Sequence, residues 1–365
     1  MRSVVTEAIT FFKIFIFLLK NVKRYYISNM ILENNKSLLN HNTFMVNCFA
    51  EQFISVKKEQ DIIDVIKILN KNKKKHFILG GGSNILFTKD ISGLIIHNKI
   101  KGIKIIKEDE LTATIRVGSG VIWNNFVKWS IEKKLWGIEN LILIPGTVGA
   151  APIQNIGAYG VEIKDVFKNL KAFNLKTGKK QKFSKKECLF GYRDSIFKNK
   201  LKNKFFIFEI EVVLQKKDNP ILTYENLKFE FKNKQKELTI KNISDVISEI
   251  RNRKLPDLNK LGNCGSFFKN PVIKEDEFQF LKKKFPEIKY FKKNEKIKLS
   301  AGWLIEQCGW KGKKINDCGV YEKQALVLVN FGGANGSEIK SLAQKIKKDI
   351  FNKFNIKLEE EVQIV

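Results

Sequence analysis

Three short stretches carry side chains that could do chemistry. In GNCGSFFKNP, residues 262–271, a glycine precedes Ser266 and two phenylalanines follow it, which suits either a turn serine or a hydroxyl that gives up a proton. In GYRDSIF, residues 191–197, Arg193 adjoins an aspartate, and such a pair is usually structural. LEEEV, residues 358–362, offers three glutamates, for which a solvated edge strand is the ordinary interpretation.

Two glycine-rich stretches suit a ligand that bears phosphate. GGGSN, residues 80–84, follows the short apolar run HFIL, and consecutive glycines let several backbone N–H groups point at one anion. A plain turn is the alternative, and no G-x-G-x-x-G opens a helix as it would in a Rossmann site. In IPGTVGAAPIQNIGAYG, residues 144–160, small residues would let a flat ligand approach, while Gln154 and Asn155 could pair with ring heteroatoms.

The basic charge has two interpretations. The chain has 67 basic and 38 acidic residues, a formal net charge of +29, which would suit a nucleic-acid or membrane-surface binder. Only six residues are arginine, however, and nucleic-acid readers depend on arginine for bidentate contacts. Because the lysines are spread over nearly every segment, a lysine-biased composition is the favoured explanation, and we expect no nucleic-acid partner.

The five cysteines and three histidines argue against a metal centre. The cysteine count is odd, no two cysteines have C-x-x-C spacing, and no histidine has a partner at metal-ligand spacing. We therefore expect no disulfide framework, no metal site and no histidine-based triad. Free cysteines indicate a reducing compartment, so a cytoplasmic protein is expected.

The N-terminal segment is apolar but short. AITFFKIFIFLLK, residues 8–20, contains Lys13 and is below the length that spans a bilayer, and no small-residue cleavage site follows it. We expect residues 1–29 to be a dispensable extension, with Met30 as a plausible alternative start. A membrane-associating anchor is the alternative, but stable membrane insertion is not expected.

Apolar periodicity predicts the elements that must position these stretches. Helical spacing, beginning with Ile62, Val65 and Ile66, is followed by the strand HFIL and the glycine turn. Helices are expected within residues 59–75, 121–137, 239–254 and 335–356, the last with Ser337 as its N-cap. Strands are expected within residues 111–120, 166–175, 204–214, 325–331 and 356–365, with NPILTYENL, residues 219–227, as a loop. The stretch Pro256–Gly262 is the best candidate for a domain boundary.

Taken together, the motifs resemble one family. GGGSNIL, IPGTVGAAPIQNIGAYG, GYRDSIF, LTYENL, GNCGSFFKNP, AGWLIEQC and LEEEV occur in this order in the UDP-N-acetylenolpyruvoylglucosamine reductases, flavoenzymes of peptidoglycan precursor synthesis. The resemblance runs from about residue 35 to the C-terminus. LTYENL resembles the subtype that carries a mobile tyrosine over the substrate.

The resemblance implies an α+β fold. An FAD-binding unit of the vanillyl-alcohol-oxidase/PCMH type would have two subdomains, at residues 30–98 and 99–253. A separate α+β substrate-binding domain would span residues 254–353, and residues 354–365 would return to the active site as a strand. We expect the protein to act as a monomer.

The resemblance also implies the reaction. NADPH would reduce non-covalently bound FAD and leave, and the enolpyruvyl group of UDP-N-acetylglucosamine enolpyruvate would then be reduced to UDP-N-acetylmuramate in the same cleft. Hydride would come from reduced FAD and the proton from Ser266. Arg193 would polarise the substrate carboxylate and stabilise the enolate, with help from Glu361, because charge develops there.

The remaining site residues follow from the same resemblance. Residues 80–84 would hold the FAD pyrophosphate, and residues 146–157 would line the flavin. The implied cofactor contacts are Gly80, Gly81, Gly82, Ser83, Asn84, Gly146, Gly149, Gln154, Asn155, Ile156 and Gly157. The implied substrate contacts are Tyr159, Tyr224, Lys254, Asn270 and Gln324.

One departure and two alternatives accompany the resemblance. In a strand, Glu359 and Glu361 would share a face and Glu360 would take the other. Gln363 stands where a family member has an arginine, so the electrostatics near Glu361 would differ. Another PCMH-type FAD oxidoreductase, acting on a sugar acid, is the second hypothesis. The third is a basic nucleic-acid-binding protein. No histidine lies in either glycine stretch, which predicts non-covalent flavin.

Overall fold

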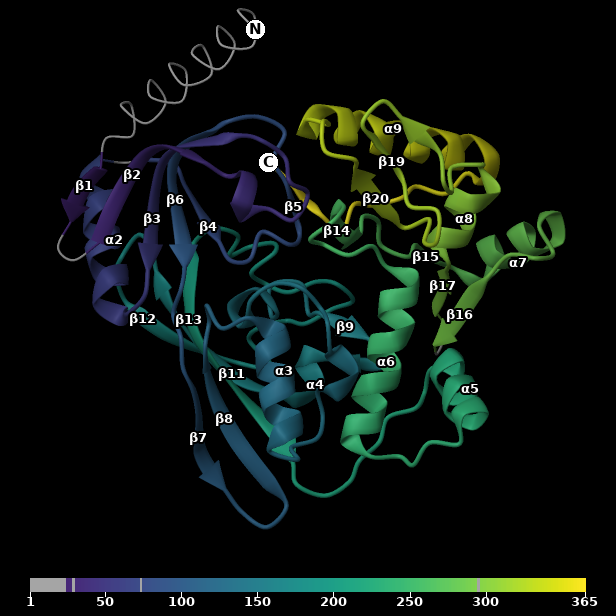
Figure 1. Cartoon of the computed structure of the whole chain (residues 1–365), viewed down its shortest axis with the longest axis horizontal. Helices are drawn as coiled ribbons and strands as arrows, with labels where there is room; N and C mark the ends of the chain where they lie inside the picture. Colours follow the sequence, from purple (N-terminus) through teal and green to yellow (C-terminus); the bar gives the residue numbers. More distant parts are fainter. Residues whose placement is uncertain (1–23, 28–29, 73, 294–295) are drawn as a thin grey trace, which may run out of the picture.

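The computed structural model describes residues 24–27, 30–72, 74–293 and 296–365, which form three packed units (Figure 1). The first unit is a five-stranded sheet in the order β1-β2-β3-β6-β4, in which β3, β6 and β4 run parallel. Its strands are β1 (Arg24–Ile27), β2 (Met30–Ser37), β3 (Phe49–Val56), β4 (His76–Leu79) and β6 (Ile91–Asn98). Most of the expected N-terminal extension lies outside the described residues, but β1 pairs with β2.

Helix α2 (Glu59–Asn72) packs on the first sheet as its periodicity predicts. Ile62, Val65 and Ile66 are buried and belong to one hydrophobic cluster with residues of β2, β3 and β6. A short 3₁₀ turn, η1 (Leu39–His41), connects toward β3. Strand β4 follows α2 in the chain and ends directly before the glycine turn. Because α2 packs on the sheet that contains β4, this packing helps to position the turn.

The second unit is an antiparallel sheet in the order β12-β11-β13-β8-β7. Its strands are β7 (Ile103–Glu108), β8 (Thr112–Gly118), β11 (Phe167–Asn174), β12 (Lys180–Ser184) and β13 (Phe205–Gln215). The other elements of this unit are α3 (Trp123–Glu132), η2 (Glu139–Leu141), η3 (Val148–Ala150), β9 (Gly157–Ala158), β10 (Val161–Glu162), α4 (Ile163–Val166), α5 (Glu225–Lys234) and α6 (Ile240–Lys254).

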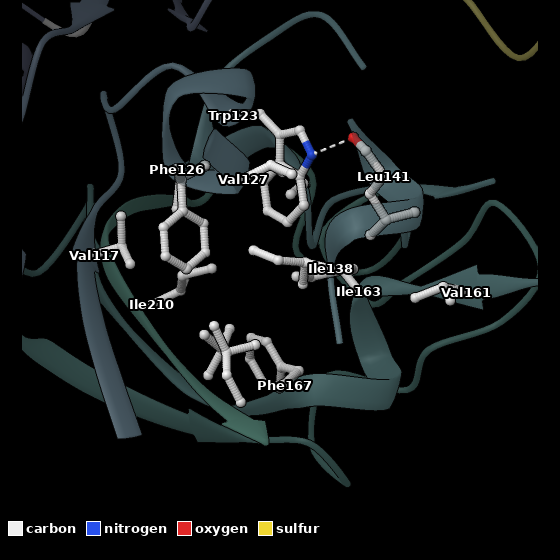
Figure 2. Close-up of a cluster of buried hydrophobic side chains, with 14 of the residues drawn as sticks. Val117, Trp123, Phe126, Val127, Ile138, Leu141, Val161, Ile163, Phe167 and Ile210 are labelled. Carbon is white, nitrogen blue, oxygen red and sulfur yellow. Dashed lines mark hydrogen bonds between the residues drawn. The ribbon is translucent and has the colours of Figure 1, made fainter. Parts of the chain in front are cut away.

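A buried cluster fixes the irregular chain between α3 and β11 (Figure 2). The Trp123 indole Nε1 donates to the Leu141 carbonyl oxygen at 3.0 Å, which satisfies the only polar atom of a buried ring. Phe126 packs edge-on against Trp123, with ring centroids 5.8 Å apart. Ile138 and Ile163, one on each side of the glycine-rich stretch, are fully buried in the same cluster. The ends of that stretch are thereby held while its middle remains irregular.

The third unit combines two small sheets with three helices. One sheet has the order β14-β20-β19-β18 and the other β15-β17-β16. Their strands are β14 (Gly262–Ser266), β15 (Val272–Ile273), β16 (Tyr290–Lys293), β17 (Lys296–Leu299), β18 (Lys314–Ile315), β19 (Cys318–Val320) and β20 (Val327–Asn330). The helices are α7 (Glu275–Lys284), α8 (Ala301–Gln307) and α9 (Gly336–Phe354).

The C-terminal residues return to the first unit. Strand β21 (Gln363–Ile364) pairs in parallel with β5 (Ile85–Leu86), which directly follows the glycine turn. The Val365 carbonyl oxygen accepts from the Thr88 N–H at 2.7 Å and from the Thr88 hydroxyl at 2.8 Å. Figure 1 shows the C-terminus beside β5.

Two local predictions are corrected by the structure. Asn335, not Ser337, caps α9: its Oδ1 accepts from the Glu338 N–H at 3.0 Å, and Glu338 Oε2 accepts from the Asn335 N–H at 2.8 Å. This reciprocal capping box satisfies two end donors, whereas Ser337 donates to the Thr88 carbonyl oxygen. The expected loop at residues 219–227 ends at Tyr224, because α5 begins at Glu225. In the described part of the chain, the helices are all too short or too polar to cross a membrane.

Candidate active site

A cavity of about 610 Å³ lies where the three units meet. The first unit contributes β4 and the glycine turn, and the second contributes most of the stretch from Ile144 to Ala158. The third unit contributes Cys264–Ser266 and the last residues of the chain. The five motifs that resemble flavoenzyme motifs at residues 80, 144, 191, 262 and 358 therefore converge on one space.

The glycine turn fits an anionic, close-approaching ligand. A Cβ at Gly80 would come within 2.6 Å of the Thr147 hydroxyl, and one at Gly81 would come within 3.0 Å of the Gly146 Cα. Gly82 has a φ of +64°, and a Cβ there would overlap the His41 carbonyl oxygen. Side chains are thus excluded behind the turn, so its backbone can lie directly against a phosphate. This cradle fits the pyrophosphate of a bound FAD.

Asn84 joins the glycine turn to the opposite wall. Its Nδ2 donates to Gln154 Oε1 at 2.7 Å and to the Glu361 carbonyl oxygen at 3.1 Å. Nine of the eleven expected cofactor residues line the cavity. The two exceptions are Gly146, which backs Gly81, and Asn155.

Asn155 serves the loop instead of the cavity. It is fully buried with a φ of +46°, its Nδ2 donates to the Gly191 carbonyl oxygen at 2.9 Å, and its Oδ1 accepts from the Lys164 N–H at 3.1 Å. These bonds connect the glycine-rich stretch to the GYRDSIF segment. Asn155 therefore positions Gln154 and Ile156, which do line the cavity.

Arg193, Ser266 and Glu361 line the same cavity. Arg193 Nε lies 2.9 Å from Glu361 Oε1, and its Nη2 donates to the Gly157 carbonyl oxygen at 2.6 Å. Ser266 ends β14, next to Gly265, whose φ is +68° and whose absent Cβ leaves open space. An ion pair, a hydroxyl and an open wall are thus brought together from three distant segments.

Burial and nearby cations set the charge of Glu361. Burial raises the pKa of its carboxyl, and the Arg193 guanidinium, the Lys198 ammonium and the Lys269 ammonium limit that rise. Its side chain is 14% exposed, compared with 74% for Glu359. Glu361 is therefore a buried carboxylate whose charge is balanced by three nearby cations.

Each of the three glutamates has its own cation. Glu359 pairs with Lys269 at 3.0 Å, and Glu360 pairs with Lys347 of α9 at 2.8 Å. The segment is not a regular strand here: it forms one bridge, between Phe268 and Glu360, before β21 begins. The expected common face of Glu359 and Glu361 is therefore not found, since Glu359 is exposed and Glu361 lines the cavity.

Comparison with known proteins identifies the family. Residues 256–365 match the family described as UDP-N-acetylenolpyruvoylglucosamine reductase, C-terminal domain, and residues 50–184 match an FAD binding domain. The UDP-N-acetylenolpyruvoylglucosamine reductase of Flavobacterium johnsoniae is 47% identical over 92% of this chain and 100% of its own length. This chain belongs to the UDP-N-acetylenolpyruvoylglucosamine reductase family. The relative of the same name from Bdellovibrio bacteriovorus is 40% identical over 91% of this chain and 99% of its own.

The solved structure of the reductase from Thermus caldophilus supports the fold. It matches with a TM-score of 0.64 and 20% identity, and covers 94% of this chain and 98% of its own. The expected α+β architecture and the FAD cofactor of this reductase family are thereby confirmed.

The five expected substrate residues lie outside the lining of the cavity in this family member. Tyr159 and Tyr224 contact each other, with ring centroids 5.6 Å apart, and Tyr224 stacks on Phe291 of β16 at 6.2 Å. Lys254 is the last residue of α6. Asn270 Oδ1 accepts from the Ala301 N–H at 2.9 Å, at the start of α8.

Gln324 makes a local bond as well. Its Oε1 accepts from the Leu326 N–H at 3.3 Å, and a Cβ at Gly302 would lie 3.3 Å from the same oxygen. Gln324 is thus placed against the start of α8, close in the fold to Asn270.

Two cationic residues at this family's site were not anticipated from the sequence. Lys198 lines the cavity and donates to the Arg193 carbonyl oxygen at 3.3 Å, and burial lowers the pKa of its ammonium. Arg251 also lines the cavity; Nη2 donates to the Leu143 carbonyl oxygen at 3.1 Å, and within the described residues no group bonds to Nε. Two sequence signals point to these residues: Lys198 directly follows GYRDSIF, and Arg251 lies one helical turn before Lys254.

Proposed function

We propose that this protein reduces the enolpyruvyl group of UDP-N-acetylglucosamine enolpyruvate to UDP-N-acetylmuramate, with NADPH as co-substrate and non-covalent FAD as cofactor. The convergence of Arg193, Ser266 and Glu361 on one cavity with the glycine turn is the observation that supports it. The names of the relatives at up to 47% identity support the same substrate.

The chain's own residues would hold the cofactor. Gly80–Asn84 would hold the pyrophosphate, and Gln154–Gly157 would line the ring system, since both segments face the cavity. The chemistry that FAD supplies when bound is transfer of two electrons from a nicotinamide to an alkene. Cys264 is the cysteine of this lining, and burial raises the pKa of its thiol to about 12, so it stays unreactive and the flavin stays unattached.

Arg193 stabilises the negative charge that develops on the substrate, and Glu361 holds the Arg193 guanidinium in position. The planar guanidinium suits a planar carboxylate, and its bonds to Glu361 and to the Gly157 carbonyl oxygen fix its plane before substrate arrives. Such preorganised charge favours the enolate that forms when the alkene is reduced. Glu361 keeps the guanidinium from moving toward the substrate's other anionic groups.

Ser266 supplies the proton. The hydroxyl O–H bond breaks, the proton goes to the enolate carbon, and solvent reprotonates the oxygen. An alcohol is a weak acid, but a carbanionic enolate is a strong base, so modest acidity suffices. The open wall at Gly265 leaves the hydroxyl approachable from the cavity.

The residues outside the cavity lining would hold the nucleotide part of the substrate. Tyr224 would act as the mobile tyrosine of its subtype, beside Tyr159, with Lys254 near the diphosphate. Asn270 and Gln324 lie close together at the start of α8 and would contact the sugar nucleotide from the third unit. We further propose the domain division at residues 98, 253 and 353, a monomeric state and a cytoplasmic location.

The test separates the two half-reactions. Stopped-flow spectroscopy would follow flavin reduction by NADPH and then flavin reoxidation by the enolpyruvyl nucleotide. Ser266→Ala should keep the first and lose the second by about a thousandfold. Ser248→Ala, which removes a hydroxyl bonded only within α6, should change neither. Reoxidation of Ser266→Ala at the wild-type rate would contradict the proton-donor role, and a protein that cannot retain FAD would contradict the whole proposal.

A further inference from the structure

A buried asparagine joins two segments that are distant in sequence. Asn140, on η2, is fully buried. Its Nδ2 donates to the Tyr159 carbonyl oxygen at 2.9 Å and to the Ile221 carbonyl oxygen at 2.9 Å. Both hydrogens of the amide are therefore used, each on a different segment. Its Oδ1 has no partner within the described part of the chain, so these two donations fix the side chain.

The segment that leads to Tyr224 is anchored twice by the same stretch of chain. At its start, Trp136 and Gln215 exchange backbone hydrogen bonds at 2.8 and 2.9 Å. At its end, Asn140 bonds to Ile221. Between the two anchors, residues 217–220 are exposed. Tyr224 follows the second anchor by three residues and immediately precedes α5.

Tyr159, the other residue to which Asn140 donates, belongs to a backbone turn that packs against the Tyr224 segment. Tyr159 has a φ of +47° and Gly160 a φ of +87°. A Cβ at Gly160 would overlap the Thr223 hydroxyl and lie 3.6 Å from Ile221 Cγ2. The backbone turn at Tyr159–Gly160 therefore lets the Tyr224 segment approach closely, and Asn140 bonds to both sides of that contact.

The Tyr224 ring lies between the second and third units. Its ring contacts Tyr159 of the second unit and Phe291 of the third. A shift at Ile221 would move the ring relative to both, because two residues separate them. The base of the segment is thus the point at which the position of Tyr224 is set.

We propose that Asn140 is a positioning residue that holds the Tyr224 segment in place for binding of the sugar nucleotide. This inference rests on the proposed function for the identity of the ligand, but the attachment of the segment can be measured without it. An aspartate at position 140 would turn an acceptor toward two carbonyl oxygens, and both bonds would be lost.

The first test compares Asn140→Asp with the wild-type holoenzyme. The concentration of enolpyruvyl nucleotide that gives half-maximal flavin reoxidation should rise about tenfold, as expected for two lost hydrogen bonds. Flavin content and reduction at saturating NADPH should stay within twofold. Trypsin should cut faster at Lys216 and Lys217, beside the first anchor. Unchanged half-saturation, or unchanged cleavage, would overturn the proposal.

A double-mutant cycle shows whether Asn140 acts through Tyr224. In a Tyr224→Ala background, Asn140→Asp should add less than twofold to the half-saturation concentration, because the ring that it positions is absent. Full additivity of the two changes would overturn the proposal. Asn330→Asp is the matched control: Asn330 Nδ2 also bridges two carbonyl oxygens, of Phe44 and Ala334, away from the tyrosine segment. It should leave cleavage at Lys216 and Lys217 unchanged.

A milder variant keeps the test valid if Asn140→Asp does not fold. If Asn140→Asp fails to retain FAD, Asn140→Ser, which keeps one donor, should show the same half-saturation and cleavage effects at smaller size; a wild-type result for both would overturn the proposal. If the wild-type flavin is not reoxidised by the nucleotide, the proposed function fails. The cleavage comparison would still decide whether Asn140 holds the segment.

Discussion

Arg193 has a φ of +53°, a left-handed backbone conformation that is costly for any residue other than glycine. Three contacts hold Arg193 there. Its guanidinium pairs with the Glu361 carboxylate and donates to the Gly157 carbonyl oxygen, and the Lys198 ammonium donates to the carbonyl oxygen of Arg193. The strain is thus maintained by the same groups that aim the guanidinium at the cavity.

Arg193→Lys tests whether the guanidinium shape matters. A lysine retains the charge but cannot pair with Glu361 and the Gly157 carbonyl oxygen in one plane while also facing a carboxylate. We expect nucleotide-driven reoxidation to fall about a hundredfold, with flavin reduction by NADPH retained. Stopped-flow rates measure both, and Lys200→Arg, a surface change in the same loop, is the control. Equal loss in both half-reactions would point to a general defect instead.

The pH dependence follows from Glu361. Burial raises the pKa of its carboxyl above the ordinary 4.5, so the group takes up a proton at a higher pH than usual as the solution is acidified. Protonation removes the charge that holds Arg193, so the reoxidation rate should fall on the acid side with an apparent pKa above 4.5. Glu361→Gln should be slower throughout and should lack that acid limb. An identical limb in the variant would assign it to another group.

The sequence alone singles out some of these residues better than others. Arginine is rare in this lysine-rich chain, so Arg193 is conspicuous, and its motif leads to the cavity. Lys198 has no such contrast, because one lysine among many gives no signal until the fold shows its burial. Asn155 illustrates the opposite case: its type suits ligand binding, but the Gly191 carbonyl oxygen and the Lys164 N–H of α4 use both ends of its amide.

At the scale of elements, the glycine turn after β4 depends on a backbone conformation as well as on space. Gly82→Ala would introduce a side chain at a φ of +64° and against the His41 carbonyl oxygen. We expect the purified variant to lose most of its FAD, measured by the ratio of flavin to protein absorbance. Gly309→Ala is the matched control, because Gly309 has a φ of +73° with no atom within 4 Å of the added Cβ. Similar FAD loss in both variants would mean that backbone strain alone explains it.

Periodicity predicted the regular elements well and their ends less well. Helices α2, α3 and α6 lie where apolar spacing places them, since each buries one face. The start of α9 was wrong by two residues, because a serine and an asparagine both suit an N-cap and only the bond to Glu338 decides between them. The last strand is shorter than expected because the backbone changes partner along it. Around Glu360 the chain forms a single antiparallel bridge with Phe268, and only Gln363–Ile364 then pair with β5.

At the scale of the whole molecule, the cavity belongs to no single unit. FAD bound there would contact residues of all three, so it should stabilise the folded protein as a whole. At a hundredfold excess over the dissociation constant, this linkage contributes about 2.7 kcal/mol. We expect FAD to raise the Tm of the apoprotein by roughly 3 to 4 °C in a thermal melt. The Gly82→Ala variant should show little shift, and a rise as large as that of the wild type would contradict the role of the turn.

The arrangement of the three units could not be obtained from periodicity. Local patterns identify β5 and β21 at best as short apolar runs, yet their pairing joins positions 278 residues apart. The bond between Thr88 and Val365 joins positions 277 residues apart. The order of the motifs did predict that these segments share a site, because the resemblance carries the whole fold with it. What the motifs did not show was the set of contacts between distant segments, such as the bond of Asn84 to the Glu361 carbonyl oxygen, which joins the first unit to the third.

The pairing of β21 with β5 also sets an order of events during synthesis on the ribosome. The glycine turn is translated early, but residues 360–364, which complete the wall beside it, emerge only after nearly all the rest of the chain. Until then, the apolar lining of the cavity is open to solvent in the nascent chain. We therefore expect stable loading of the cofactor to be a late step: a stop codon placed shortly before these residues would yield a chain that has the glycine turn but no closed cavity.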